Sequence, residues 1–211
     1  ERQGAFFITT FSSHIERLNT IVKHAQETGR EIVFLGRSLN KYVYAANNIG
    51  RCPFMGQIKL LKYRRQIDSF FRKLDKDRGK YLVVCTGHQG EKDSILDRIS
   101  KKSTFFKFNS GDNLIFSSSV IPTEVNIESR ARLDKKLERQ GVKLQKNVHV
   151  HGHGSKQSKK KLLELIKPQN IIPAHGSPEQ EQGLIDVAKE HGYVYGKTSH
   201  LAKNGQVFNF K

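Results

Sequence analysis

Residues 5–18, "AFFITTFSSHIERL", join a continuous apolar run to a segment with helical periodicity. A short run that is apolar at every position is typical of a strand buried on both faces, as in a parallel sheet. Ser13 followed by Glu16 three residues later predicts a capping box at the start of a helix. Apolar residues then recur at helical spacing up to Gly29, at Ile15, Leu18, Ile21, Val22 and Ala25. This stretch therefore predicts a strand that leads directly into a helix, which is the repeating unit of α/β proteins.

The same alternation continues along the chain and predicts an α/β fold with a mainly parallel sheet flanked by helices. We expect further strands at 31–36, 81–87, 113–120 and 142–150, and helices at 37–50, 63–74, 91–102 and 123–140. A loop is expected around Pro53 and Gly56, and Gly50 is expected to close the second helix. A shift in composition near residues 145–155 predicts the start of a shorter second unit.

The second unit is expected to contain two helices, at 155–166 and 178–192, with a strand and loop at 169–176 between them. The dipeptide Asn204 and Gly205 is a strong signal for a hairpin turn between two strands.

Composition restricts the class of protein and the kind of partner. The chain has 211 residues, 36% of them hydrophobic, which is enough for a substantial core. A formal net charge of +17 favours a polyanionic partner, with nucleic acid ahead of a membrane surface. The alternative is a charge that serves solubility or an unusual cytoplasm. No apolar run approaches the roughly 18 residues of a membrane span, and the start of the chain lacks a secretory signal, so we expect a cytoplasmic protein.

The two cysteines, Cys52 and Cys85, are far apart in the sequence and do not form a metal-binding or disulfide pattern.

Polar residues cluster where the predicted strands end, and in parallel α/β sheets ligands bind beyond the carboxyl ends of strands. Glycines in a strand-to-helix loop allow backbone N–H groups to approach an anion, and serine hydroxyls donate hydrogen bonds to phosphate. An ordinary turn or helix cap is the alternative explanation for each. The candidates are Ser12, Ser13, Gly87, His88, Gln89, Gly90, Ser117, Ser118 and Ser119.

Four histidines follow two later strands. His149, His151 and His153 alternate in "HVHGHG", so in an extended chain they point to one face, and His175 follows the apolar run of "IIPAHG". Four imidazoles favour a metal site or a general acid. A hydrolytic two-metal centre also needs carboxylates, and "HVHGHG" contains none. We therefore expect only part of such a centre.

Five motifs in order, "ITTFSSHIERL", "CTGHQGE", "IFSSSVIPTE", "HVHGHG" and "IIPAHG", resemble the β-CASP ribonucleases of the metallo-β-lactamase superfamily, most closely archaeal ribonuclease J. The resemblance implies a β-CASP domain at residues 1–154 and a returning segment of a metallo-β-lactamase domain at 155–211. It implies two divalent metals, usually zinc with manganese or magnesium as alternatives, and hydrolysis of RNA from the 5′ end, with endonucleolytic cutting also described. The implied partner is single-stranded RNA with a 5′-monophosphate, and a homodimer is a further expectation.

The resemblance also assigns roles to individual residues. It implies that His153 acts at the scissile phosphate and that His175 binds a metal. His149, His151 and Gly152 are expected to hold phosphate with the serine and glycine loops, although His151 replaces the serine usual in the family. The family's "HxHxDH" metal motif is absent, so we expect the carboxy-terminal part of a longer enzyme, beginning near Gly4 and inactive alone.

A basic segment offers contacts to the RNA backbone, with Tyr63 available for stacking. A solvated basic helix face is the alternative. Its cations are Lys59, Lys62, Arg64, Arg65, Arg72 and Lys73. Three other functions remain open at this stage: an endonuclease of the cleavage-and-polyadenylation type, a non-catalytic RNA-binding module, and a stand-alone histidine-rich metal-binding protein.

Overall fold

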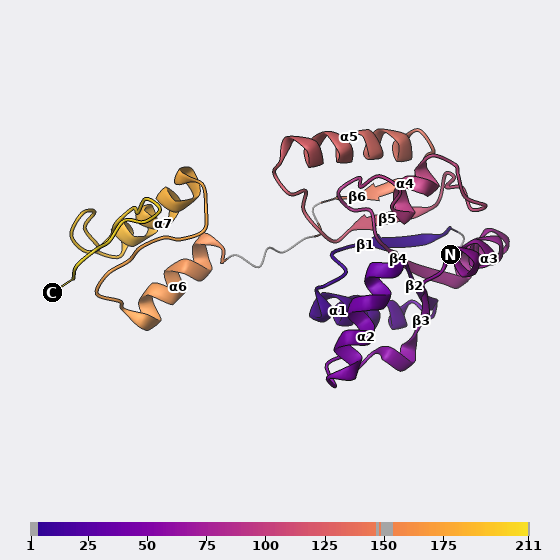
Figure 1. Ribbon diagram of the computed structural model, residues 1–211, viewed down its shortest axis with the longest axis horizontal. Helices are drawn as coiled ribbons and strands as arrows, with labels where there is room; N and C mark the ends of the chain where they lie inside the picture. Colours follow the sequence, from indigo (N-terminus) through magenta and orange to yellow (C-terminus); the bar gives the residue numbers. More distant parts are fainter. Residues whose placement is uncertain (1–3, 147, 149–153, 211) are drawn as a thin grey trace. The chain divides into compact units, whose positions relative to one another are not determined.

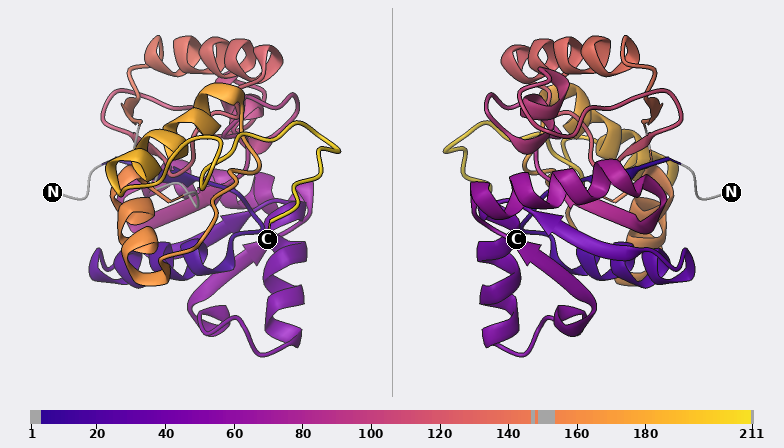
Figure 2. Two further views of the ribbon diagram at one scale, coloured as in Figure 1. Left: turned by 90° about the vertical axis from the view of Figure 1, so that its left-hand side faces the viewer. Right: turned by 90° about the vertical axis from the view of Figure 1, so that its right-hand side faces the viewer.

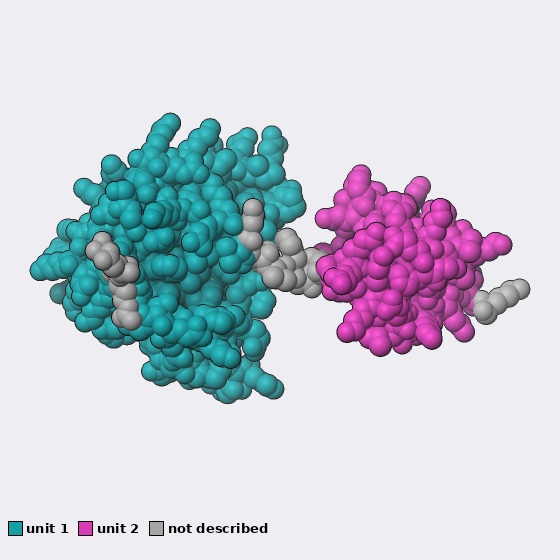
Figure 3. Space-filling view, turned by 180° about the vertical axis from the view of Figure 1, so that it is seen from behind, with its two compact units in different colours: residues 1–150 teal, residues 151–211 magenta. Residues whose placement is uncertain are grey.

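The computed structural model describes residues 4–146, 148 and 154–210, which form two compact units (Figures 1 and 3). Unit 1 spans Glu1–Val150 and unit 2 spans His151–Lys211. Across the described residues, no helix combines the length and the apolar character that crossing a membrane requires.

Unit 1 is built on a six-stranded sheet with the order β3-β2-β4-β1-β5-β6, in which every pair of neighbours is parallel. The strands are β1 Phe6–Thr9, β2 Glu31–Leu35, β3 Ile58–Leu61, β4 Tyr81–Cys85, β5 Asn113–Phe116 and β6 Lys143–Gln145. The predicted class, a parallel sheet flanked by helices, is confirmed.

Two layers of helices cover the sheet because its strands carry apolar side chains on both faces. Helices α1 (Ile15–Glu27) and α2 (Arg37–Asn48) pack on one face with Ile8, Phe34 and Val84. Helices α3 (Arg64–Lys76), α4 (Ile95–Ser100) and α5 (Glu124–Glu138) pack on the other face. In both views of Figure 2, α5 lies on the opposite side of the sheet from α1 and α2.

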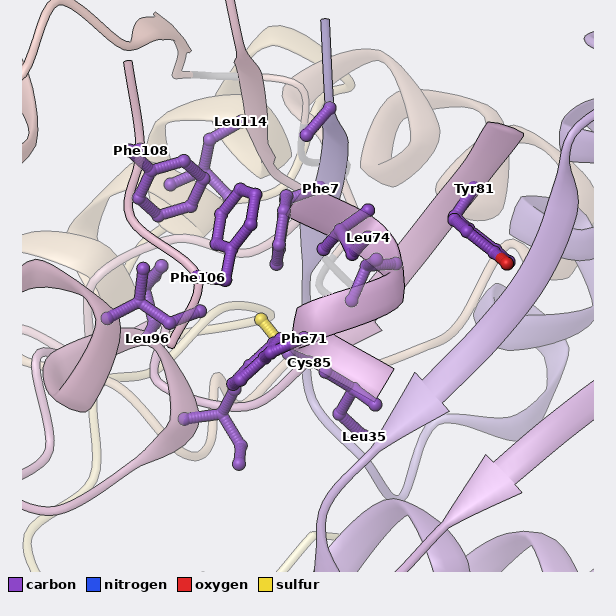
Figure 4. Close-up of a cluster of buried hydrophobic side chains, with 14 of the residues drawn as sticks. Phe7, Leu35, Phe71, Leu74, Tyr81, Cys85, Leu96, Phe106, Phe108 and Leu114 are labelled. Atoms are coloured by element: carbon purple, nitrogen blue, oxygen red, sulfur yellow. The ribbon is translucent and has the colours of Figure 1, made fainter. Parts of the chain in front are cut away.

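An aromatic cluster fills the core beneath α3, α4 and α5 (Figure 4). The ring of Phe106 lies 5.3 Å from those of Phe7 and Phe108 and 5.9 Å from that of Phe71, measured between centroids. Each such ring contributes about 1.5–3 kcal/mol when it is fully buried. These residues come from β1, α3 and the segment before β5, so the cluster fixes these parts of the chain together.

The connections create a switch point around β1. After β1 the chain enters α1 on one face of the sheet, whereas after the neighbouring strands β4 and β5 it enters α4 and α5 on the other face. Loops that diverge in this way leave space between them, which is where doubly wound folds bind ligands.

The structure corrects three details of the predicted elements in unit 1. Strand β3 lies in a segment that the sequence did not identify as a strand, and it pairs only with β2, as an edge strand. Helix α1 is capped by His14, whose Nδ1 accepts from the backbone N–H of Arg17 at 3.2 Å, and not by Ser13. Helix α4 is shorter than the expected 91–102, because Ser94 caps its start and Lys102 has a left-handed φ of 57° beyond its end.

Unit 2 contains α6 (Lys156–Ile166) and α7 (Pro178–Glu190) around a small core of Leu163, Ile171, Val187 and Ala188. The strand expected at 169–176 is reduced to an isolated bridge between Ile171 and Ser199. A turn does form at Asn204 and Gly205, but no described residue beside it is in a strand, so the hairpin prediction was wrong. The tail packs instead by its aromatic rings, with Phe208 and Phe210 lying 5.2 and 5.4 Å from the ring of His200.

Candidate functional site

Three loops that carry the predicted phosphate-binding residues lie next to one another at the carboxyl ends of the adjacent strands β4, β1 and β5. Thr9, at the end of β1, is in register with Cys85 of β4 on one side and Phe116 of β5 on the other. The backbone N–H of Ser117 donates to Thr9 O at 2.9 Å, and Thr10 Oγ1 donates to Ser117 O at 2.9 Å. We call residues 10–14, 86–94 and 117–123 the switch-point loops. They include Ser12, Ser13, Gly87, His88, Gln89, Gly90, Ser117, Ser118 and Ser119.

Both glycines of the loop after β4 have packing reasons to be glycine. Gly87 has a φ of 120°, and a Cβ there would lie 2.6 Å from Leu96 Cβ. Gly90 has a φ of 78°, and a Cβ there would lie 2.4 Å from the carbonyl oxygen of Ser129 in α5. The glycines therefore let this loop lie directly against α4 and α5, which is a structural role whether or not the loop also meets an anion.

Gln89 links two of the switch-point loops. Its side chain is buried, and its Nε2 donates to Ser119 O while its Oε1 accepts from the N–H of Ile121, both at 2.9 Å. Both ends of the amide are thus engaged with the loop after β5. Gln89 therefore fixes residues 119–121 against the loop after β4.

His88 follows β4 and its side chain is buried. Its ring packs edge-on against Phe11 with centroids 4.3 Å apart, and its Nδ1 lies 3.9 Å from Glu91 Oε1. Burial lowers the pKa of His88 and outweighs the opposing effect of Glu91, so the imidazole is neutral at neutral pH. Within the described residues, neither ring nitrogen is hydrogen-bonded, and the same holds for the buried hydroxyls of Thr9 and Ser118.

Unpartnered buried groups of this kind are uncommon, since each one costs about 1–3 kcal/mol. Thr9, His88 and Ser118 lie in or just after the neighbouring strands β1, β4 and β5, which is a reason beyond the sequence motifs to look for a ligand at this switch point.

Sequence reasoning missed two arginines that support these loops. Arg130 of α5 is buried, with Nη1 donating to His88 O at 2.9 Å, Nε donating to Asp134 at 2.8 Å and its guanidinium 3.2 Å from the centroid of the Phe116 ring. Arg17 of α1 donates from Nη1 to Ser117 O at 3.0 Å, and burial lowers its pKa. The only sequence signal for Arg130 is Asp134 four residues later, a pairing that is also common on solvated helices.

The histidine motif falls outside the part of the chain that the structure describes, so the predictions for His149, His151, Gly152 and His153 stay predictions. His175 is exposed in unit 2, between Ile171 and α7, with a left-handed φ of 64°. Among the described residues, no group of three or more His, Cys, Asp or Glu side chains could hold a metal ion.

The cations of the basic segment differ in their partners. Lys59 pairs with Glu31 at 2.7 Å, and Arg64 pairs with Asp68 at 3.7 Å. Arg72 lies 4.0 Å from the centroid of the Phe105 ring, and Lys62 Nζ lies 5.3 Å from that of Tyr63. Arg65 and Lys73 make no ion pair with any described acidic residue.

Comparison with known proteins agrees with the fold. Residues 3–131 match a family described as "Ribonuclease J, beta-CASP domain", and residues 140–200 match a "Zn-dependent metallo-hydrolase RNA specificity domain". The fold and these matches define a protein of the β-CASP class. Within it, the chain belongs to the ribonuclease J family.

Curated relatives support the archaeal resemblance. The chain is 36% identical over 199 residues to "Ribonuclease J" of Pyrococcus abyssi, covering 94% of this chain and 44% of that protein. It is 35% identical over 205 residues to "Ribonuclease J" of Methanocaldococcus jannaschii, covering 97% and 46%. A bacterial relative, "Ribonuclease J 1" of Streptococcus pyogenes, is 32% identical over 209 residues, covering 97% and 35%. The chain spans less than half the length of these relatives.

Proposed function

We propose that the protein to which this chain belongs hydrolyses RNA as a ribonuclease J-type nuclease, and that the switch-point loops hold an RNA phosphate. The observation that carries this proposal is that Thr9, His88 and Ser118, which lie in or just after three neighbouring strands, have buried polar groups without a hydrogen-bond partner among the described residues. The name of these relatives, ribonuclease J, supports RNA as the substrate. We further propose single-stranded RNA with a 5′-monophosphate as the ligand, and a homodimer as the assembly.

The chemistry of the loops suits a phosphate. A neutral imidazole offers one N–H donor, and the Ser118 hydroxyl offers another, both of which a phosphate oxygen accepts. Arg17 and Arg130 place two fixed positive charges against the same loops through their hydrogen bonds to Ser117 O and His88 O. In this proposal the arginines position the loops and favour a dianion, while His88 and Ser118 contact it.

The roles inferred from the family motifs complete the proposal. His153 assists at the scissile phosphate, His149, His151 and Gly152 position RNA, and His175 binds one of two divalent metals, zinc or alternatively manganese or magnesium. A bound metal of this type activates water and stabilises charge on the phosphodiester. The role proposed for the switch-point loops is the binding and orientation of RNA. The proposed division is a β-CASP domain at 1–154 and a metallo-β-lactamase segment at 155–211.

The binding proposal is tested with this chain and two short RNAs that differ only in a 5′-phosphate or a 5′-hydroxyl, each labelled at the 3′ end. Fluorescence anisotropy should show tighter binding of the phosphorylated RNA, and Ser118→Ala or His88→Gln should reduce that preference about tenfold. Ser110→Ala is the matched control, because Ser110 is an exposed serine just before the opposite, amino end of β5. Equal affinity of the wild-type chain for the two RNAs would refute the phosphate site.

A further inference from the structure

A groove of about 640 Å³ lies between the edge strand β3 and helix α3, and no residue of the switch-point loops lines it. Its lining includes three cations, Lys59, Arg65 and Lys73, and two tyrosines, Tyr63 and Tyr81, and it includes no carboxylate. We call it the β3–α3 groove. Both elements that form it are labelled in Figure 1.

The groove has a rigid floor. The ring of Phe70 packs edge-on against that of Tyr81, with centroids 5.1 Å apart, and both side chains are buried. At the carboxyl end of β3, Gln66 Oε1 accepts from the backbone N–H groups of Lys62 at 3.3 Å and Tyr63 at 3.1 Å. These bonds fix the turn from β3 into α3, so the position of Tyr63 is set by backbone geometry and its ring remains 61% exposed.

Two of the three cations of the groove, Arg65 and Lys73, have no acidic partner among the described residues, and the third, Lys59, shares its partner. Glu31 is the acidic neighbour of Lys59 at 2.7 Å, but it also faces Lys80 at 3.1 Å, and these two ammonium groups lower its pKa. Arg65 and Lys73 have no ion pair with any acidic residue that the structure describes. The neighbouring cations of α3 do have partners. Arg64 forms an ion pair with Asp68, and the guanidinium of Arg72 lies over the ring of Phe105. The groove therefore combines free cations with an exposed aromatic face.

We propose that the β3–α3 groove binds the part of the single-stranded RNA that follows the 5′ phosphate held by the switch-point loops. In this proposal a base stacks on Tyr63, and backbone phosphates contact Arg65 and Lys73. This inference rests on the proposed function. Aromatic rings beside a cationic track are the usual means of binding single strands without reading sequence. Lys62 Nζ, 5.3 Å from the centroid of the Tyr63 ring, adds a further positive charge next to the stacking face.

The position of Tyr63 fits one continuous strand of RNA. Tyr63 follows the carboxyl end of β3. Because all strands of the sheet are parallel, Tyr63 lies on the same side of the sheet as the switch-point loops, which follow the carboxyl ends of β1, β4 and β5. Three strand spacings of about 4.8 Å separate β3 from β1, which gives a span of about 14 Å. A few nucleotides cross that span, so an RNA whose 5′ phosphate is held near β1 reaches Tyr63 and continues along α3.

The test compares a short RNA that fills only the switch-point loops with one of about 12 nucleotides, a length within the range bound by comparable single-strand sites. Tyr63→Ala, Arg65→Ala and Lys73→Ala should each weaken the long RNA about tenfold while the short RNA binds as before. The two cation variants should also lower the slope of log affinity against log salt by ~0.7 each, one phosphate contact apiece. Arg64→Ala is the matched control, because it removes the same charge next to Arg65 from a side chain that is paired with Asp68.

The outcomes separate this inference from the proposed function. If Arg64→Ala and Arg65→Ala weaken the long RNA equally, the effect is a general one of charge and the groove proposal fails. It also fails if all three groove variants bind long RNA like the wild type, as expected if the free edge of β3 accepted a peptide strand instead. Loss of the 5′-phosphate preference with retained groove effects would refute only the switch-point site. Circular dichroism of each variant confirms that it is folded before binding is interpreted.

Discussion

At the scale of single residues, Gly90 shows how closely the loop after β4 is packed. A Cβ at this position would meet three backbone atoms of α5 within 2.8 Å, at a φ of 78° that already disfavours any side chain. We expect Gly90→Ala to lower the free energy of unfolding by about 2–4 kcal/mol, because neither backbone can move without disturbing the sheet. Urea unfolding followed by circular dichroism measures this.

Gly50→Ala is the control for Gly90→Ala. Gly50 has a similar φ of 69° after α2, but nothing lies within 4 Å of its Cβ position. It should cost only the conformational penalty, about 1 kcal/mol. Equal losses for the two variants would mean that the contact with α5 is unimportant.

His88 predicts a dependence of stability on pH. Because burial lowers its pKa, the unfolded chain takes up a proton on this side chain at a higher pH than the folded chain does. The contribution of His88 to the free energy of unfolding is therefore complete above the pKa of the unfolded chain, about 6.5. It is lost as the pH falls below that value, by at most ~1.4 kcal/mol per pH unit. Unfolding free energies at pH 7.5, 6.5 and 5.5 should fall more steeply for the wild type than for His88→Leu. Parallel curves would show that His88 does not titrate differently on folding.

At the scale of elements, the sequence predicts strands and helices best where burial is complete. The runs that became β1, β2 and β4 are apolar at nearly every position, and the sequence predicts them as strands. Strand β3, in contrast, has only partly buried or exposed residues. An edge strand needs fewer apolar residues, so its pattern is indistinguishable from that of an irregular segment. The cap of α1 was missed for a related reason, since only the folded geometry decides between Ser13 and His14.

Asp112 joins the amino ends of two neighbouring strands. It is fully buried and accepts from the N–H of Ala5 at 2.8 Å, the N–H of Asn109 at 2.9 Å and Nη1 of Arg78 at 2.7 Å. Asp112→Ala leaves three donors without an acceptor, so we expect a loss of about 3–5 kcal/mol in the free energy of unfolding. Asp75→Ala removes the second carboxylate that pairs with Arg78. The side chain of Asp75 is half exposed, so its loss should lower the free energy of unfolding by less than about 1 kcal/mol. A loss for Asp112→Ala as small as that for Asp75→Ala would contradict this prediction.

At the scale of the whole molecule, the candidate site depends on the order of strands, which no local pattern contains. The sequence identified residues 12–13, 87–90 and 117–119 because each group follows a predicted strand. It could not show that β4, β1 and β5 are neighbours, since the connections from β1 to β2 and from β4 to β5 each pass over a strand. Nor could it identify Arg130 as a support for His88, because the contact joins residues 42 positions apart.

The two units differ in the size of their cores, and this predicts different stabilities. Unit 1 has two large clusters, one on each face of its sheet, whereas the cluster of unit 2 consists of Leu163, Ile171, Val187 and Ala188. A unit of this size buries a smaller fraction of its surface, and helices without a large core open at low free energy.

Native-state hydrogen exchange with mass spectrometry measures this difference on the intact chain. Amides of α6 and α7 should exchange at lower denaturant concentration than those of β1 and β4, which lie in the middle of the sheet. Exchange of all four elements in one transition would show instead that unit 2 unfolds only together with unit 1. The control is Leu163→Ala, which should accelerate exchange in α6 and α7 and leave β1 and β4 unchanged, because Leu163 belongs to the core cluster of unit 2.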